Sequence, residues 1–317
     1  MVKLYDAGGG YIEAEVSEFY CNDFPNYFAR TGKKTYFRDT ELIYGVPPMI
    51  YGNKPTDGGN LILSPEERDD LIKREPRAEK WIRPYVGALE FIRGKKRYCL
   101  WLVDCPPNEL RKMPLVYKRV QAVRDFRLAS KAASTRKAAE TPWLFRQIAD
   151  PKTDYLLVPS VSSERRFYVP IGYMDANTIA SNLVHMIPGA KLWHFGVLTS
   201  WPHMAWMRMT CGRLKSDYRY SATIVYNNFP WPPFSREVER TAWQILEARC
   251  NYPDASFADL YDPLIMPKDL RRAHEANDRA VMEAYDFPRD MTEPQMFLAL
   301  QSMYVSLLNL EKIFKEV

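Results

Sequence analysis

The sequence predicts an α+β protein in which a mixed-sheet domain over residues 1–234 precedes a small all-α helical bundle over residues 235–317. Before residue 234, short apolar runs alternate with turn residues. After it, apolar residues recur at helical spacing. Pro230, Pro232 and Pro233 separate the two patterns, because proline fixes the backbone and lacks an amide donor. The net charge also changes there, from +10 over residues 1–234 to −5 over residues 235–317.

Composition limits the class of protein. The chain has 317 residues, enough for one large domain or two ordinary ones, and with 46% apolar and 26% charged residues it is not disordered as a whole. It has neither a run of eighteen apolar residues nor an N-terminal secretory signal, so no membrane partner is expected. The five scattered cysteines argue for free thiols in the cytoplasm and against a zinc ribbon.

The first elements expected are short strands and a capped helix. Residues 11–46 read as short strands and turns, with Ile12, Ala14 and Val16 alternating with polar residues. Residues 61–63 form a brief strand. Ser64, with Pro65 after it and Glu67 three residues on, then predicts a helix that begins with a capping box.

A buried strand and a basic helix follow. The apolar run over residues 98–103 predicts a strand with both faces covered. A helix is expected after Pro114, extending to about Ala139. Its inward face is Val116, Val120, Val123 and the stem of Arg127. Residues 111–137 carry nine basic side chains and one acidic side chain, Asp125, which gives this helix a positive face.

Later strands are predicted at 155–161, 166–172, 192–198 and 221–226, with a helix over 201–211 between the last two. Beyond the proline break, three helices are expected, beginning near Ser235, at Pro267 and after Thr292, whose capping box Gln295 completes. The last helix carries an apolar seam that we expect to pack against the two preceding helices. The seam residues are Met296, Leu300, Met303, Leu307, Leu310 and Phe314.

No catalytic constellation is visible in the sequence. The histidines are His185, His194, His203 and His274, and they lack acidic or cysteine partners at metal-ligand spacing. Gly8-Gly9-Gly10 reads as a turn because no strand precedes it and no helix start follows it. Two proline-containing segments, at 104–108 and 227–230, resemble the amino-methyltransferase motif but do not match it. A free-standing enzyme is therefore the least expected reading.

Arginine, lysine and aromatic residues instead gather in two loops, over residues 162–168 and 204–221. Lysine and arginine bind phosphates, arginine can bind a guanine edge through two nitrogens, and an aspartate can accept a hydrogen bond from cytosine. The candidate DNA contacts are Lys54, Arg124, Lys131, Arg165, Arg166, Arg208, Arg213, Lys215, Asp217 and Arg219. The alternative is that Tyr218 and Tyr220 pack in the core while the charges are merely solvated.

Several longer segments resemble one family. They include Asp154-Tyr155-Leu156-Leu157-Val158-Pro159, Leu192-Trp193-His194-Phe195-Gly196, Cys211-Gly212-Arg213-Leu214-Lys215-Ser216, Tyr226-Asn227-Asn228-Phe229-Pro230 and Leu260-Tyr261-Asp262-Pro263-Leu264. Over about residues 36–317 the chain resembles the C-terminal part of MmeI-like restriction–modification enzymes and related DNA methyltransferases. The resemblance implies a DNA target recognition domain over residues 1–234 and a C-terminal helical bundle over residues 235–317.

The resemblance also implies where the chemistry takes place. In that family a nuclease and a methyltransferase domain precede this region, and the methyltransferase transfers a methyl group from S-adenosylmethionine to an adenine extruded from the helix. None of its catalytic residues can be carried over to this chain. We therefore expect no cofactor here, S-adenosylmethionine in an associated methyltransferase domain or subunit, and double-stranded DNA as the partner.

Three functions remain open at this point. The first is a sequence-specific recognition module for duplex DNA within an adenine methyltransferase of a restriction–modification system, a bacterial defence. The second is a protein-interaction or scaffolding subunit of a DNA-modification or defence complex, in which the acidic helical tail binds the partner. The third is a single-strand or RNA binder that stacks bases on its aromatic residues. Competition between duplex and single-stranded oligonucleotides separates the first from the third.

Overall fold

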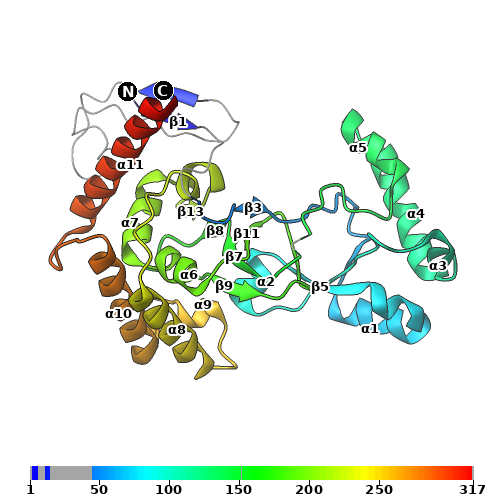
Figure 1. Ribbon diagram of the computed structural model, residues 1–317. Helices are drawn as coiled ribbons and strands as arrows, with labels where there is room; N and C mark the ends of the chain where they lie inside the picture. The colour runs from blue at the N-terminus through cyan, green and yellow to red at the C-terminus, as the bar shows by residue number, and fades with distance from the viewer. Residues whose placement is uncertain (1, 6–10, 15–44, 151, 316–317) are drawn as a thin grey trace. The chain divides into compact units, whose positions relative to one another are not determined.

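A computed structural model describes residues 2–5, 11–14, 45–150 and 152–315 (Figure 1). They form two compact units that interleave along the chain. The first unit consists of Met1–Met49, Val158–Gly172 and Gly189–Val317, and the second of Ile50–Leu157 and Tyr173–Pro188. The chain is a mixed α/β structure that continues into C-terminal helices, as predicted. The domain boundary near residue 234 stays a prediction.

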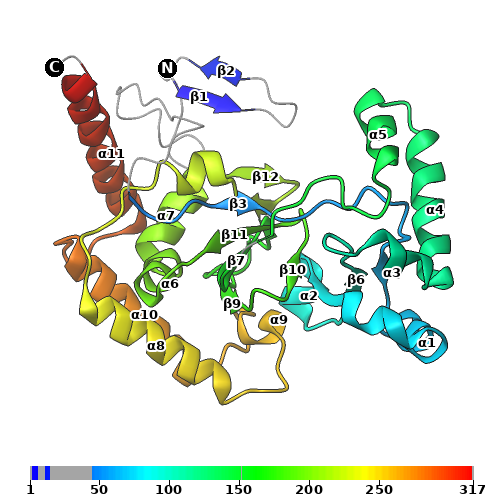
Figure 2. The same ribbon diagram turned by 45° about the vertical axis from the view of Figure 1, so that its right-hand side comes forward.

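The second unit contains a mixed four-stranded sheet in the order β10-β5-β6-β4 (Figure 2). Strand β10 (Ile179–Ala180) pairs parallel with β5 (Ile82–Val86). The antiparallel strands are β6 (Tyr98–Leu100) and β4 (Ile62–Leu63). Its helices are α1 (Pro65–Arg74), η2 (Pro76–Trp81), α2 (Ala88–Arg93), α3 (Pro107–Arg111), α4 (Pro114–Leu128), α5 (Ala133–Lys137) and η3 (Ala138–Glu140). Leu61, Leu100 and Val123 lie in its apolar core.

Another four-stranded sheet has the order β3-β11-β7-β9. Its strands are β3 (Ile50–Tyr51), β11 (Val184–Pro188), β7 (Tyr155–Pro159) and β9 (Gly172–Met174). Strand β3 is antiparallel to β11. Every residue of β7 is buried, and β7 covers most of the strand predicted at 155–161.

The first unit carries a small antiparallel sheet in the order β12-β13-β8. Strand β8 (Val161–Ser162) pairs with β13 (Asp217–Arg219), and β13 pairs with β12 (Gly212–Leu214) as a hairpin. At the N-terminus, β1 (Val2–Tyr5) pairs with β2 (Tyr11–Ala14). Val16 and the Gly8-Gly9-Gly10 turn lie outside the described residues.

Helices form the rest of the first unit. They are α6 (Leu192–Leu198), α7 (Trp201–Thr210), the π-helical turn η4 (Ala222–Tyr226), α8 (Arg236–Cys250), α9 (Phe257–Leu260), α10 (Lys268–Ala284) and α11 (Glu293–Lys315). Helix α8 packs against both α10 and α6. The approach to α6 is close, because a Cβ atom at Gly196 would lie 2.7 Å from the Val238 side chain.

Four predictions about elements are wrong. Residues 192–198 form the helix α6 and not a strand, because a fully buried helix and a buried strand read alike as apolar runs. Residues 221–226 form η4, in which the Ser221 side chain accepts a hydrogen bond from the Ile224 amide. The strand predicted at 166–172 is mostly loop, and β9 begins only at Gly172. The long basic helix ends at Leu128 and resumes as α5.

The last helix also packs differently from the prediction. Helix α11 packs mainly on α7, whereas the two preceding helices pack on each other. Its buried face is Met296, Phe297, Leu300 and Tyr304, while Met303 and Leu307 are half-buried. The side chains of Leu310 and Phe314 lie outside the described residues. Within the described part of the chain, none of the helices combines the length and the apolar character that a membrane span requires.

Candidate nucleic-acid interface

The β12–β13 hairpin presents three of the predicted contacts. Arg213, Lys215 and Arg219 are all exposed. Lys215 has φ of 57°, the left-handed conformation that lets the chain reverse between the strands. The Arg213 guanidinium carbon lies 4.1 Å from the centre of the Tyr218 ring, and Arg213 Nη1 donates a hydrogen bond to the Ser216 carbonyl at 3.0 Å. The hairpin therefore holds one arginine in a defined place at the surface.

Tyr218 and Tyr220 are buried, as the alternative interpretation of this loop predicted. Their burial does not withdraw the charges from the surface, because neighbouring residues of a strand point to opposite faces of the sheet. Arg219 lies between the two tyrosines in sequence and is exposed, so the aromatic rings support the hairpin while the cations remain available.

The loop from Ser162 to Tyr168 lies beside this hairpin. Ser162 pairs with Tyr218 across β8 and β13, and Asp217 Oδ1 accepts a hydrogen bond from the Glu164 amide at 3.3 Å. These contacts bring the exposed Arg165 and the half-buried Arg166 to the hairpin that carries Arg213. Asp217 was predicted to accept from a base, and in this structure one of its oxygens already holds the loop.

Arg208 differs from the other candidates. Only 9% of its side chain is exposed, and Nη1 donates to Glu293 Oε2 at 2.9 Å. Its Nη2 donates to the Phe167 carbonyl, and the guanidinium lies over the Phe167 ring. Arg208 is thus an internal support of the loop rather than a surface cation, and no sequence pattern indicates its partner 85 residues away.

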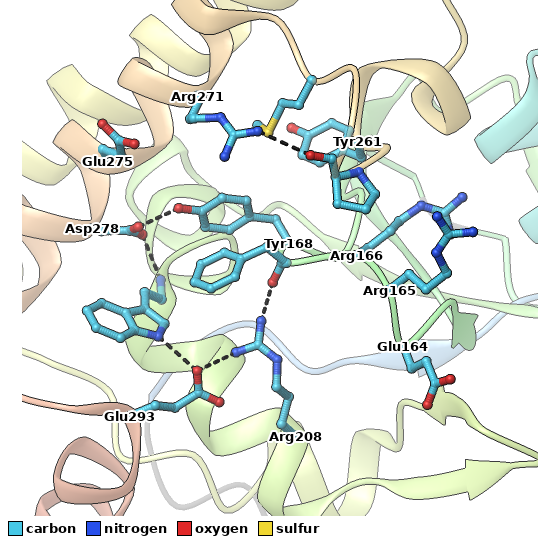
Figure 3. A pocket seen from close by; sticks show the side chains of 14 residues that line it. Glu164, Arg165, Arg166, Tyr168, Arg208, Tyr261, Arg271, Glu275, Asp278 and Glu293 are labelled. Atoms are coloured by element: carbon cyan, nitrogen blue, oxygen red, sulfur yellow. Dashed lines mark hydrogen bonds and ion pairs between the residues drawn. The ribbon is translucent and has the colours of Figure 1, made fainter.

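A cavity of about 770 Å³ lies behind the loop (Figure 3). Arg165, Arg166 and Arg271 line it together with the carboxylates of Glu275 and Asp278. Asp278 Oδ2 accepts from the Tyr168 hydroxyl at 2.5 Å, and its Oδ1 accepts from the Trp201 amide at 2.7 Å. Burial raises the pKa of the Asp278 carboxyl to about 7, although both hydrogen bonds oppose the shift.

The second unit holds the remaining candidates, Lys54, Arg124 and Lys131, and all three are exposed. The Lys54 backbone exchanges hydrogen bonds with Gln147. Arg124 lines a second cavity of about 450 Å³. Lys131 lies in the turn between α4 and α5, where its carbonyl accepts from Arg136 Nη1 at 2.7 Å. These cations belong to α4 or to the loops around it.

The whole side chain of Arg127 on α4 is buried, including its guanidinium group. The sequence predicted only that the aliphatic part of this side chain faces inward. Its Nε donates to the Thr56 carbonyl, and its two terminal nitrogens donate to four further carbonyls. Those acceptors are Pro55, Ala138, Thr141 and Leu144, at 2.7–3.1 Å. Arg127 therefore fixes the loops that flank Lys54 and Lys131.

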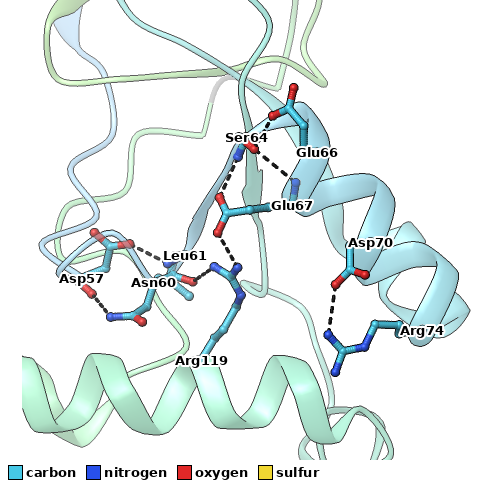
Figure 4. A network of polar contacts seen from close by, with 9 residues as sticks. All are labelled: Asp57, Asn60, Leu61, Ser64, Glu66, Glu67, Asp70, Arg74 and Arg119. Atoms are coloured by element: carbon cyan, nitrogen blue, oxygen red, sulfur yellow. Dashed lines mark hydrogen bonds and ion pairs between the residues drawn. The ribbon is translucent and has the colours of Figure 1, made fainter.

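Arg119, another basic residue of the segment 111–137, also forms bonds within the protein (Figure 4). Arg119 donates to the Asn60 carbonyl at 3.2 Å and to Glu67 Oε1 at 2.8 Å. Glu67 completes the predicted capping box of α1, since its Oε2 accepts from the Ser64 amide while Ser64 Oγ accepts from the Glu67 amide. Part of the positive charge of residues 111–137 is thus neutralised within the second unit.

The described histidines and cysteines form no metal site. His203 contacts the Tyr220 hydroxyl at 2.9 Å, and burial lowers the pKa of His203 to about 3. His274 contacts the Tyr261 hydroxyl at 2.8 Å. The residues that the structure describes contain no group of three potential metal ligands. Their four cysteines are free thiols, as expected, and Cys21 lies outside the described residues.

Comparison with known proteins shows two family matches. Residues 36–233 match the family described as the MmeI target recognition domain, and residues 233–310 match the MmeI C-terminal domain. The chain is 38% identical over 269 residues to DNA methyltransferase A of Bacillus subtilis, covering 84% of this chain and 30% of that protein.

A solved structure is also similar. It is the type IIL restriction–modification enzyme MmeI in complex with DNA, with a TM-score of 0.83 and 45% sequence identity. The match covers 86% of this chain and 37% of the enzyme. The chain therefore spans about a third of the length of the relatives it matches.

Proposed function

The chain belongs to the family of the MmeI target recognition and C-terminal domains, and from that premise we propose that it recognises a specific sequence in double-stranded DNA. The observation that carries the proposal is the β12–β13 hairpin, where Arg213, Lys215 and Arg219 are exposed beside the loop that carries Arg165. A two-stranded ribbon fits the major groove, and the arginines it carries can contact guanine edges through two nitrogens. The similar MmeI structure contains DNA, which supports duplex DNA as the ligand.

The two units have different proposed roles. Lys54, Arg124 and Lys131 of the second unit contact phosphates, which fixes register without reading sequence. The hairpin and the Ser162–Tyr168 loop of the first unit read the bases. Arg208 and Asp217 contribute to reading mainly by supporting that loop, since both already have partners within the chain.

The proposal includes an associated catalytic domain. One relative is a DNA methyltransferase and the other is a restriction–modification enzyme, so this chain acts with a methyltransferase domain, attached or in trans, in a cytoplasmic restriction–modification system for bacterial defence. That domain would supply methyl transfer from S-adenosylmethionine.

We propose that S-adenosylmethionine binds in the associated domain and not in this chain. Gly87 lies at a strand-to-helix turn, between β5 and the short helix α2. The Glu90 carboxylate accepts a hydrogen bond from the Gly87 amide at 2.9 Å, so this amide is already used within the chain. No step of the methyl transfer is therefore assigned to this chain.

Titration of a fluorescent duplex at several salt concentrations tests the proposal. We expect binding that weakens as salt rises, and duplexes selected from a randomised pool should bind more tightly than a scrambled duplex. Binding without salt dependence contradicts the proposal. So does a chain that binds no DNA but forms a stable complex with a methyltransferase through residues 235–317, which would identify a scaffolding subunit. Preference for single strands over the duplex would identify the stacking mode instead.

A further inference from the structure

The loop from Ser162 to Tyr168 is held at both ends. At one end β8 pairs with the hairpin, and Asp217 accepts the Glu164 amide. At the other end Tyr168 contacts α10 directly, and α11 acts on the loop through Arg208, which bonds both Glu293 and the Phe167 carbonyl. The recognition loop and these helices lie within the same compact unit. The C-terminal helices are therefore linked, α10 directly and α11 through Arg208, to a segment that the proposed function assigns to DNA.

The first C-terminal contact starts at Glu293, in the first turn of α11 (Figure 3). Its Oε2 accepts from Trp201 Nε1 at 3.0 Å and from Arg208 Nη1 at 2.9 Å. The other terminal nitrogen of Arg208 donates to the Phe167 carbonyl. Glu293 thus orients Arg208, and Arg208 fixes the backbone of the loop one residue beyond Arg166.

The second contact starts at Asp278 of α10. Its two oxygens accept from the Tyr168 hydroxyl at 2.5 Å and from the Trp201 amide at 2.7 Å. The Tyr168 ring stacks on His274 of the same helix, with ring centres 4.1 Å apart. Tyr168 is therefore fixed both by its hydroxyl and by its face, which leaves the end of the loop little freedom.

The charge around the cavity argues for a positioning role and against an anion site. Four basic residues line it, and four acidic residues balance them. The basic residues are Arg165, Arg166, Arg208 and Arg271; the acidic residues are Glu164, Glu275, Asp278 and Glu293. Glu293 and Asp278 are engaged with Arg208 and Tyr168, so their contacts act on the conformation of the loop.

We propose that helices α10 and α11 hold the Ser162–Tyr168 loop in its DNA-binding conformation, with Glu293 and Asp278 as positioning residues that do not themselves contact DNA. The effect on DNA affinity rests on the proposed function, whereas the effect of the helices on the order of the loop does not. A loop that is ordered before binding loses less conformational entropy on binding. The C-terminal helices thereby contribute to DNA affinity from behind the interface.

Hydrogen exchange without DNA tests the structural part. Glu293→Gln keeps an acceptor for Trp201 but removes the ion pair with Arg208. Glu283→Gln is the matched control, since Glu283 pairs with Arg289 at the surface. We expect amides 164–168 to exchange roughly tenfold faster in Glu293→Gln, which corresponds to a free energy of local opening lower by about 1.4 kcal/mol. Their exchange should be unchanged in Glu283→Gln. Unchanged exchange in Glu293→Gln overturns the proposal.

DNA affinity tests the consequence, and the sign of the change is informative. Removing a negative charge near DNA ordinarily strengthens binding, because phosphates repel carboxylates. We expect Glu293→Gln instead to weaken binding to a selected duplex about tenfold, with Glu283→Gln neutral. Tighter binding, or faster exchange with unaltered affinity in a chain that binds DNA, overturns the positioning role. If the wild-type chain binds no DNA, the proposed function fails, while the exchange result still decides whether the helices hold the loop.

A double-mutant cycle separates positioning from general destabilisation. If Glu293 acts through the loop, the effect of Glu293→Gln on affinity is largely lost in an Arg165→Ala, Arg166→Ala background. Equal effects in both backgrounds overturn the proposal. Tyr168→Phe repeats the measurements through the second contact while keeping the ring and its packing, so the proposal can be decided even if Glu293→Gln does not fold.

Discussion

The Arg127 side chain shows how a single residue can organise two loops. Its buried guanidinium donates to five carbonyl oxygens from segments 55–56 and 138–144, so each of its N–H groups has a partner. A lysine in its place has three donors in a compact group and leaves at least two of these carbonyls without one. The stability at this position therefore depends less on the positive charge than on the planar guanidinium group with its five donors.

We predict that Arg127→Lys lowers the free energy of unfolding by roughly 2–4 kcal/mol, since each unsatisfied buried carbonyl costs about 1–3 kcal/mol. Urea denaturation monitored by tryptophan fluorescence measures this. Arg124→Lys, one turn earlier on the exposed side of α4, serves as the control and should change stability by less than about 0.5 kcal/mol. Equal effects of the two substitutions would contradict the role assigned to Arg127.

Asp278 supplies a prediction about pH. Its folded pKa is about 7 and its unfolded value is 3.8, so the folded state holds a proton that the unfolded state releases between these values. Its contribution to stability is therefore complete below about pH 4 and is lost as the pH rises to about 7. The titratable groups near Asp278 are Tyr168, Glu275 and Arg279, and His274 stacks on the Tyr168 ring. Burial is the largest cause of the raised pKa of Asp278.

Asp278→Asn removes this titration but keeps hydrogen-bonding groups toward Tyr168 and Trp201. We predict that the stability of Asp278→Asn relative to wild type rises between about pH 4 and pH 7, by at most about 1.4 kcal/mol per pH unit, and is constant above. His203 and His274 titrate in both proteins, so their effect cancels in the difference. Chemical denaturation across pH checks it, and a difference that falls with pH would refute the assignment.

Arg213 and Arg219 are the residues that we expect to read bases. If one of them binds a guanine edge through two nitrogens, its replacement by alanine should relax selectivity at one base pair by roughly 1–3 kcal/mol. Selection from randomised duplexes with each variant measures the loss. Arg240→Ala on α8, where the arginine is paired with Glu237 on the surface, is the control. A uniform loss across all positions would mean that the arginine binds phosphate instead.

At the scale of elements, α4 and the turn after it define the proposed phosphate-binding face of the second unit. Lys131 lies beyond the last turn of α4, where the Ser130 and Lys131 carbonyls both accept from Arg136 and turn the chain into α5. The break shortens the predicted helix but leaves Lys131 exposed. The face is therefore a helix followed by an ordered turn.

We predict that Lys131→Ala weakens binding to all duplexes alike and lowers the magnitude of the salt slope by about 1, because one phosphate contact is lost. Titration of selected and scrambled duplexes checks both effects. Lys73→Ala, an exposed change on α1, is the control. A loss confined to one base pair would contradict the phosphate assignment.

Elements with local signals were predictable. Ser64, Pro65 and Glu67 specify the start of α1 without any tertiary contact, and the capping box is present as predicted. The inward stripe of α4 was also correct, including Arg127. Helix α6 was not, because its residues Trp193, Phe195, Val197 and Leu198 are buried on all sides and leave no helical periodicity in the sequence.

At the scale of the whole molecule, the positive balance of residues 1–234 overstates the charge available to DNA. Arg119, Arg127 and Arg208 are used inside the protein. Of the predicted DNA-binding cations, seven are exposed, namely Lys54, Arg124, Lys131, Arg165, Arg213, Lys215 and Arg219. The number of phosphates contacted is thus expected to be small.

We predict a slope near −5 for the logarithm of the binding constant against the logarithm of salt concentration, as expected for about six neutralised phosphates, because the exposed cations of the hairpin and its loop also displace counterions when they enter the groove. Titrations between about 50 and 200 mM salt determine it. A slope near zero would contradict the electrostatic interface, whereas a much steeper one would mean that more cations reach DNA than the exposed candidates.

The sequence by itself determined the α+β class, the helical C-terminal part, the capped start of α1 and the family, because these depend on local spacing and on motifs contiguous in the chain. Only the tertiary structure decided which cations remain exposed, since the partners of Arg208 and Arg127 lie up to 85 residues away. It also decided that α11 packs on α7, because the choice between apolar faces depends on shape complementarity that no periodic pattern records.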